Sequence, residues 1–141
     1  MIPRYTPLDI GAIWTDGQRI RTWLDVEVAA CTAMAELGMI PEDDAAQIRA
    51  AAGQVDADKL AARALEIEKT TKHDVIAFLT AFEEEAGEVA RHVHYGMTSS
   101  DVLDTSLALQ LVEASKLIER IDPTKNWNLA NIAIKERDFR H

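Results

Sequence analysis

Residues 98–121 read TSSDVLDTSLALQLVEASKLIERI, and this stretch decides the fold class. Its apolar residues recur at steps of three and four, the spacing that places side chains on one face of a helix. The hydroxyl residues at its start are typical helix caps. We therefore predict a long amphipathic helix whose stripe has the heptad-like spacing of a helical bundle. The stripe comprises Leu103, Leu107, Leu111, Ala114, Ile118 and Ile121.

Helical spacing also runs through the segments that precede this stretch. Thr15 is expected to cap a helix, with Gln18 completing a capping box, and Gly38 suits a left-handed stop after it. The apolar stripe of this helix is Ile20, Trp23, Leu24, Val28, Cys31, Met34 and Ala35. Two further helices are expected from Pro41 to just before Gly53, and from a cap at Asp56 to about Lys69.

A fourth helix is predicted to start within residues 70–74. Beyond the quoted stretch, Asp122 and Pro123 indicate a new helix or a kink, and a helical pattern resumes from Trp127 to Asp138. The predicted class is all-α: a helical amino-terminal domain over 1–95, then the truncated start of a long-helix bundle domain over 96–141. The stripe expected on the fourth helix is Val75, Leu79, Phe82, Ala86, Val89 and Val93.

Composition narrows the possible partners and the compartment. With 24 acidic and 15 basic side chains the formal net charge is −9, which repels nucleic acid and anionic lipid. Residues 1–5 lack the apolar run of a secretory signal, and no stretch is long and apolar enough to span a membrane. Cys31 has no second thiol for a disulfide. We expect a cytoplasmic protein with no nucleic-acid or membrane partner.

Two predicted helix starts carry unusual polar groups, and function is argued from them. One is TTKHD at 70–74, where Lys72 and a protonated His73 would add positive charge to the free backbone donors of the first turn. The other is TSS at 98–100, preceded closely by His92 and His94. Helix starts of this kind are suited to binding an anionic ligand.

Structural interpretations of the same residues remain open. Hydroxyl residues before an apolar run usually cap the helix, and TSSD fits a capping box closed by Asp101. A histidine such as His73 often makes only a surface hydrogen bond. His92 and His94 lack the i, i+4 spacing of paired metal ligands. No glycine-rich nucleotide loop or nucleophile elbow occurs in the sequence, so we expect no metal and no cofactor.

Longer motifs around these helix starts resemble the adenylosuccinate lyase family, a branch of the fumarase and aspartase superfamily. The motifs are EIEKTTKHDVIAF at 66–78 and HYGMTSSDVLDT at 94–105, with shorter matches at 2–5 and 11–14. The resemblance covers roughly residues 1–120, the amino-terminal portion of such enzymes. It implies a carbon–nitrogen lyase of purine (AMP) biosynthesis, a homotetramer that releases fumarate from adenylosuccinate and from the succinyl-carboxamide ribotide.

The resemblance also implies roles for individual residues. His94 would lie at the substrate pocket, serving phosphate or helping to orient its neighbours, and His73 is a possible auxiliary acid. The main acid and base would be a histidine of a TH motif and a serine of a mobile loop, both in later segments, and His141 does not match the former because it follows Arg140. No catalytic residue is therefore secure here, and we expect the chain alone to be inactive. The implied substrate-binding residues are Arg4, Tyr5, Lys72, His73, Asp74, His94, Thr98 and Ser99.

Two alternatives remain. Another lyase of the superfamily, acting on argininosuccinate or carboxymuconate, would share the TSSD start, whereas Arg4, Tyr5 and the KHD triplet at 72–74 favour a nucleotide substrate. A non-catalytic helical oligomerisation module is favoured by the heptad-like stripes. In such a module, alanine at Lys72 or Ser99 would change nothing measurable.

Overall fold

The computed structural model describes residues 6–121, and all regular secondary structure in this range is helical. The all-α class predicted from the sequence is therefore confirmed. Arg4, Tyr5 and everything expected after Ile121 lie outside the described residues. The elements are α1 (Leu8–Ile13), α2 (Asp16–Glu36), α3 (Glu42–Gln54), α4 (Ala57–Thr71), α5 (Asp74–Ala86), the 3-10 helix η2 (Gly87–His92) and α6 (Ser99–Ile121).

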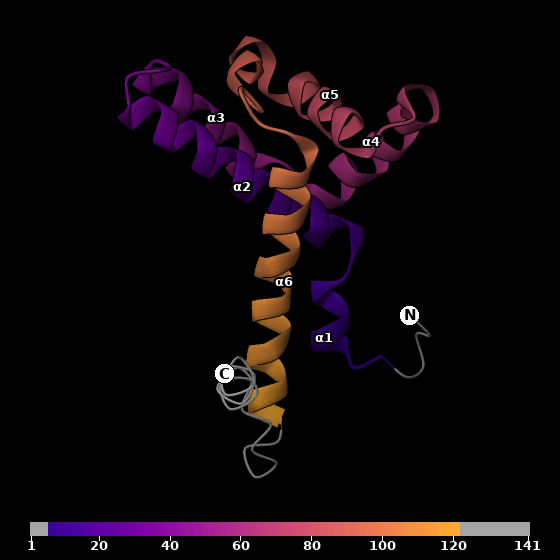
Figure 1. The fold of residues 1–141 in the computed structure, drawn as a ribbon. Coiled ribbons are helices and arrows are strands. Elements are labelled where there is room, and N and C mark those ends of the chain that lie inside the picture. Colours follow the sequence, from indigo (N-terminus) through magenta and orange to yellow (C-terminus); the bar gives the residue numbers. More distant parts are fainter. Residues whose placement is uncertain (1–5, 122–141) are drawn as a thin grey trace, which may run out of the picture.

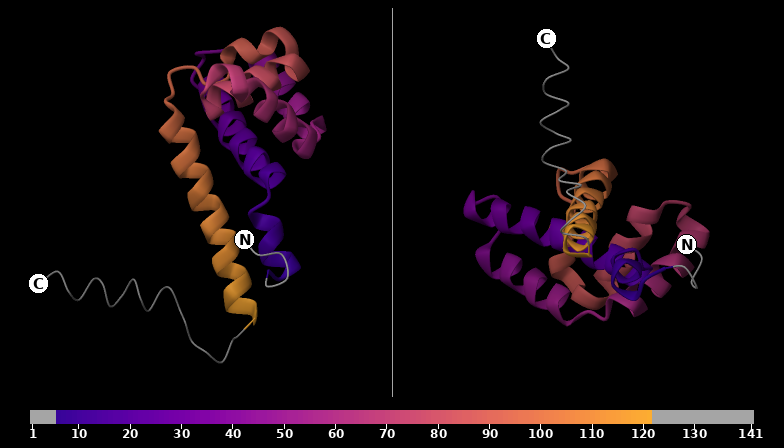
Figure 2. Two further views of the ribbon diagram at one scale, coloured as in Figure 1. Left: turned by 90° about the vertical axis from the view of Figure 1, so that its right-hand side faces the viewer. Right: turned by 90° about the horizontal axis from the view of Figure 1, so that it is seen from below.

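The helices form a head and a stem. In the head, α2 and α3 make one antiparallel pair and α4 and α5 make another (Figure 1). The long helix α6 leaves the junction of the two pairs, and α1 runs beside it (Figures 1 and 2). The side-chain amide of Gln110 on α6 donates a hydrogen bond of 2.6 Å to the backbone carbonyl of Ile13 at the end of α1. This contact fastens the stem.

Aromatic side chains at the centre of the head hold the two helix pairs together. Trp23 of α2 meets Phe78 of α5 edge to face, with ring centroids 5.4 Å apart and an interplanar angle of 79°. Phe78, Phe82, Leu24 and Ile48 are all buried in the same cluster. Full burial of each such side chain contributes about 1.5–3 kcal/mol. Most of the apolar side chains that α2 contributes to this core belong to its predicted stripe.

The predicted caps of α2 and α4 are confirmed. The hydroxyl oxygen of Thr15 accepts a hydrogen bond of 3.1 Å from the backbone N–H of Gln18. The carboxylate of Asp56 accepts bonds from the backbone N–H groups of Asp58 and Lys59. Gly38 has the expected left-handed backbone, with a φ of 70°. Two local details differ from the prediction, because the short helix α1 was not foreseen and α3 continues through residue 53 to Gln54.

The fourth predicted helix starts at Asp74, the last position of the range expected for its start, and its predicted end is wrong. Thr70 and Thr71 belong to the last turn of α4, and Lys72 is its left-handed C-cap, whose N–H donates to the carbonyl of Glu68. The next helix therefore begins only at Asp74. It ends at residue 86, because Gly87 takes a φ of 70° and a ψ of −148°, a combination that breaks an α-helix. Val89 and Val93 consequently lie beyond this helix.

The helix α6 has the predicted period but presents an unexpected face to the rest of the chain. Three residues of the predicted stripe are outward: Leu107, Leu111 and Ile118 are 47%, 51% and 52% exposed. The buried face of α6 consists mainly of small or polar side chains, and Ala114 is the one buried residue of this face that belongs to the predicted stripe. The buried residues of α6 are Val102, Ser106, Gln110 and Ala114. Among the helices of the described range, none is long and apolar enough to cross a membrane.

Candidate functional site

The start of α6 combines a cap with unused hydroxyls. The backbone N–H of Thr98 donates a hydrogen bond of 2.8 Å to the carboxylate of Asp101, which is the capping contact that TSSD predicts. The hydroxyls of Thr98, Ser99 and Ser100 make no hydrogen bond to another residue between 6 and 121. Asp101 therefore has a structural role, while three hydroxyl groups at the positive end of a long helix remain available to a ligand.

His73 caps the start of α5. Its Nδ1 atom accepts a hydrogen bond of 3.3 Å from the backbone N–H of Ile76, so a neutral ring carries its proton on Nε2. The carboxylate of Asp74 accepts a bond of 2.8 Å from the N–H of Val75. The side chains of His73 and Asp74 are about half exposed. The structural interpretation of His73 thus holds, and the Nε2 atom of this neutral ring is a donor that bonds no other described residue.

Lys72 has a different local setting from the one predicted. It lies between two helices rather than in a first helical turn, and its φ of 54° and ψ of 27° are left-handed. A residue with a Cβ atom is disfavoured there by roughly 1–2 kcal/mol. Its side chain is exposed and adds positive charge next to the start of α5. Strained backbone at a residue other than glycine often accompanies a functional role.

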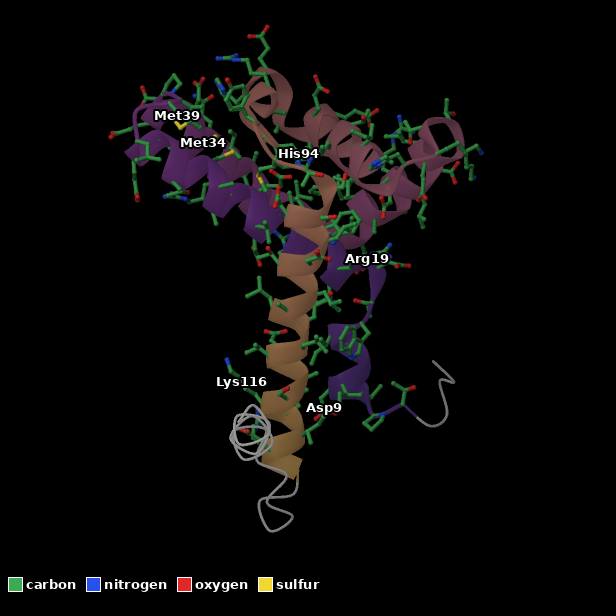
Figure 3. All side chains as sticks on the ribbon, in the orientation of Figure 1. Asp9, Arg19, Met34, Met39, His94 and Lys116 are labelled. Carbon is green, nitrogen blue, oxygen red and sulfur yellow. The ribbon has the colours of Figure 1, made fainter. Side chains whose placement is uncertain are left out.

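His94 is held by a buried carboxylate that the sequence analysis did not identify. The backbone N–H of His94 donates to Glu27 Oε2 at 2.8 Å, and its ring Nδ1 lies 2.7 Å from Glu27 Oε1. Glu27 of α2 is fully buried. His94 has a left-handed φ of 64° and lies where the chain enters α6 (Figure 3). The available signal was an acidic residue on the apolar stripe of α2, between Leu24 and Cys31.

The predicted site residues form two groups within the chain. His94, Thr98 and Ser99 lie together, because a turn in which the N–H of Met97 donates to the carbonyl of His94 leads directly into α6. Lys72, His73 and Asp74 lie at the outer end of the α4 and α5 pair, away from the start of α6 (Figure 1). No hydrogen bond or ion pair among the described residues joins the two groups.

His92 belongs to neither group. Its Nε2 atom lies 2.9 Å from the carboxylate of Asp44 on α3, which also accepts a bond of 2.8 Å from Arg91. This cluster fastens η2 to α3. Between residues 6 and 121, no three side chains of the metal-binding types gather closely enough to hold an ion.

Together the fold and these helix starts define an all-helical domain with exposed polar and cationic groups at two helix starts. Residues 9–135 match the family model described as lyase. The chain belongs to this lyase family. This family was expected from the motifs at 66–78 and 94–105.

Individual relatives within this family are adenylosuccinate lyases. The chain is 53% identical over 118 residues to an adenylosuccinate lyase of Synechocystis sp., a match covering 84% of this chain and 26% of that enzyme. It is 47% identical over 118 residues to the adenylosuccinate lyase of Bacillus subtilis, with the same coverage of 84% and 26%. The corresponding enzyme of Staphylococcus saprophyticus is 45% identical over 120 residues, covering 85% and 27%.

A solved structure has the same arrangement of helices. The fumarate lyase of Mesorhizobium sp. BNC1 superposes with a TM-score of 0.71 and 30% sequence identity, over 79% of this chain and 26% of that one. The chain thus spans about a quarter of the length of the relatives it matches.

Proposed function

We propose that this chain is the amino-terminal, substrate-binding part of an adenylosuccinate lyase. The enzyme would release fumarate from adenylosuccinate and from the succinyl-carboxamide ribotide, in the cytoplasm. The observation that carries the proposal is the identity of 53% with the Synechocystis enzyme, in a chain whose two polar helix starts fall in the motifs of that family. In this elimination, a base removes a proton beside a carboxylate and an acid protonates the departing nitrogen.

The described residues are suited to binding and charge stabilisation. Thr98 and Ser99 would donate hydrogen bonds to a carboxylate at the start of α6, where the helix dipole favours negative charge. Lys72 and the Nε2 atom of His73 would contact another anionic group, with His73 as a possible auxiliary acid. Arg4, Tyr5, Asp74 and His94 complete the proposed set. The proposal includes no cofactor.

The separation of the two groups supports an assembled site. We propose a homotetramer in which the start of α5 from one subunit and the start of α6 from another line the same pocket. The outward face of α6 supports this assembly, because Leu107, Leu111 and Ile118 are about half exposed on a helix suited to a bundle. In this proposal, residues 1–95 form the amino-terminal domain and 96–141 begin the bundle.

A chimera tests the proposal directly. The 118 matched residues of the Synechocystis enzyme are replaced by those of this chain, and fumarate release from adenylosuccinate is followed. We expect Lys72→Ala and Ser99→Ala each to lower kcat/KM about tenfold, about 1.4 kcal/mol of transition-state stabilisation. Lys116→Ala and Ser115→Ala, on a different part of α6, are the matched controls and should leave kcat/KM within about twofold.

Substrate exchange distinguishes the alternatives. A chimera that cleaves argininosuccinate but not adenylosuccinate would indicate another lyase of the superfamily. The similar fold of a fumarate lyase is the reason to test this alternative. A non-catalytic module would give a well-folded chimera in which alanine at Lys72 and Ser99 has no effect on any substrate. Either result would refute the proposed function.

A further inference from the structure

Glu27 is a fully buried carboxylate whose hydrogen-bonding partner is His94. Glu27 lies in the middle of α2 with no exposed surface, among Leu24, Cys31 and other apolar side chains of the core. Both of its oxygens are bound by one residue, His94. No lysine or arginine of the described chain pairs with this carboxylate. Burying a carboxylate is costly unless it is bound, so His94 is its compensating partner.

The two contacts fix the proton on the ring. A backbone N–H can only donate, so Glu27 Oε2 accepts from His94 N. An ionised carboxylate also only accepts, so the ring Nδ1 at 2.7 Å from Oε1 must carry a proton. The Nε2 atom is then the ring position left for a ligand. It makes no bond to another described residue, and since no buried side-chain nitrogen or oxygen there lacks a partner, it retains contact with solvent.

The position of Nε2 is held firmly. His94 sits in the left-handed region, and two hydrogen bonds to a carboxylate embedded in α2 offset the strain of that backbone. The side chain of His94 is only 15% exposed, so its ring has little freedom to rotate. The next turn of chain leads into the hydroxyls of Thr98 and Ser99. Nε2 and these hydroxyls are therefore presented by one short segment.

We propose that Glu27 is a positioning residue for His94: it holds the proton on Nδ1 and presents Nε2 to an anionic group of the substrate. An anion at Nε2 requires a proton there, which makes the ring an imidazolium, and the negative charge of Glu27 balances it. Glu27 itself touches no substrate. The identity of the ligand rests on the proposed function. The position of the proton on the His94 ring does not depend on that function.

Glu27→Gln separates this role from packing. The amide has nearly the shape of the carboxylate, but its oxygen must accept from the backbone N–H of His94, which leaves the NH₂ group facing Nδ1. Nδ1 must then accept, and the neutral ring's proton moves to Nε2. The variant disfavours the imidazolium form of His94, because the amide NH₂ group and a protonated Nδ1 would both be donors facing each other. Glu36→Gln, an exposed residue at the end of the same helix, is the control.

Nitrogen NMR of the histidine-labelled chain measures the ring directly, with the His94→Gln spectrum assigning the signal. We expect a protonated Nδ1 in the unaltered chain and in Glu36→Gln, and a protonated Nε2 alone in Glu27→Gln. An unprotonated Nδ1 in the unaltered chain would overturn the proposal, whether or not the variant folds. A variant that keeps the original ring state while remaining folded by thermal melting would overturn it as well.

Kinetics in the chimera test the consequence for binding. We expect Glu27→Gln and His94→Gln each to lower kcat/KM about tenfold, and the double variant to lose no more than either single one, because Glu27 acts through His94. Full turnover in Glu27→Gln would refute the inference and leave the proposed function standing. A chimera inactive on adenylosuccinate before any substitution would refute the proposed function, while the NMR result would still decide the state of the ring.

Discussion

At the scale of single residues, Lys72 and His94 share a left-handed backbone that glycine would adopt without strain. They are the positive-φ residues other than glycine in the described range, with φ values of 54° and 64°. Both belong to the proposed site. The strain at His94 is offset by Glu27. Lys72 is exposed, and its backbone is held by the bond from its N–H to the carbonyl of Glu68.

Lys72→Gly should therefore stabilise the fold while weakening function. We expect the free energy of unfolding to rise by about 1 kcal/mol, because glycine relieves the left-handed backbone. Urea denaturation measures the change, and Lys72→Ala, which keeps a Cβ atom, is the matched control and should gain nothing. Equal stability of the two variants would show that the backbone at this position is not strained.

Cys31 should be an unreactive thiol. Burial, with a smaller contribution from the charge of Glu27, raises its pKa from 9.0 to about 11. A pKa raised by this amount leaves about 100-fold less thiolate at any pH well below it. We expect alkylation of the native chain at about pH 8 to be at least 100-fold slower than alkylation of the urea-unfolded chain. Mass spectrometry follows the adduct, and similar rates in the two states would contradict the burial of Cys31.

At the scale of helices, the sequence predicted helix caps and stops better than it predicted which face of a helix is packed. The cap at Thr15 and the stop at Gly38 are short-range features, so the sequence determines them. The end of α4 at Lys72 could not be predicted from the sequence, because lysine is not a residue type that favours a left-handed backbone. For α6 the spacing gave the helix, yet which side faces α1 and α2 depends on the shape of those neighbours. Gln110 is buried there while Leu111 is exposed.

The exposed side of α6 leads to a prediction about self-association. Leu107→Lys with Leu111→Lys should weaken it at least tenfold, since burying each leucine contributes about 1.5–3 kcal/mol and a lysine cannot be buried there without a partner. Sedimentation of the chain over a range of concentrations measures the change. Glu119→Lys adds positive charge to an exposed polar position of the same helix and should have a smaller effect. Unchanged association in the double variant would exclude this face from the interface.

At the scale of the whole molecule, contacts between distant residues were the part that the sequence did not reveal. Trp23 was assigned to an apolar stripe and Phe78 was not, and nothing in the sequence paired them. Glu27 and His94 are 67 residues apart, and only the packing of α2 beneath the entry to α6 brings them together. The candidate site was thus predicted as a set of helix starts, while its buried support was not.

Gln110 should couple the stem to the amino-terminal helix. Its bond of 2.6 Å to Ile13 is buried, and Gln110→Ala would leave that carbonyl without its partner, at a cost of about 1–3 kcal/mol. We expect the amides of α1 to exchange with deuterium about tenfold faster or more in this variant. Gln47→Ala, whose amide bonds only within α3 at the surface, is the control. Unaltered exchange in α1 would show that other contacts hold it.

The span of 67 residues between Glu27 and His94 has a practical consequence for following denaturation. A carboxylate and an imidazole so far apart along the chain meet only when the helical head is assembled, and they separate when it opens. The ring signal of His94 is therefore a built-in reporter: its nitrogen shift should revert to that of a free histidine at the same denaturant concentration at which the tryptophan fluorescence changes. Loss of the reporter before the fluorescence transition would reveal that the entry to α6 detaches while the rest of the head is intact.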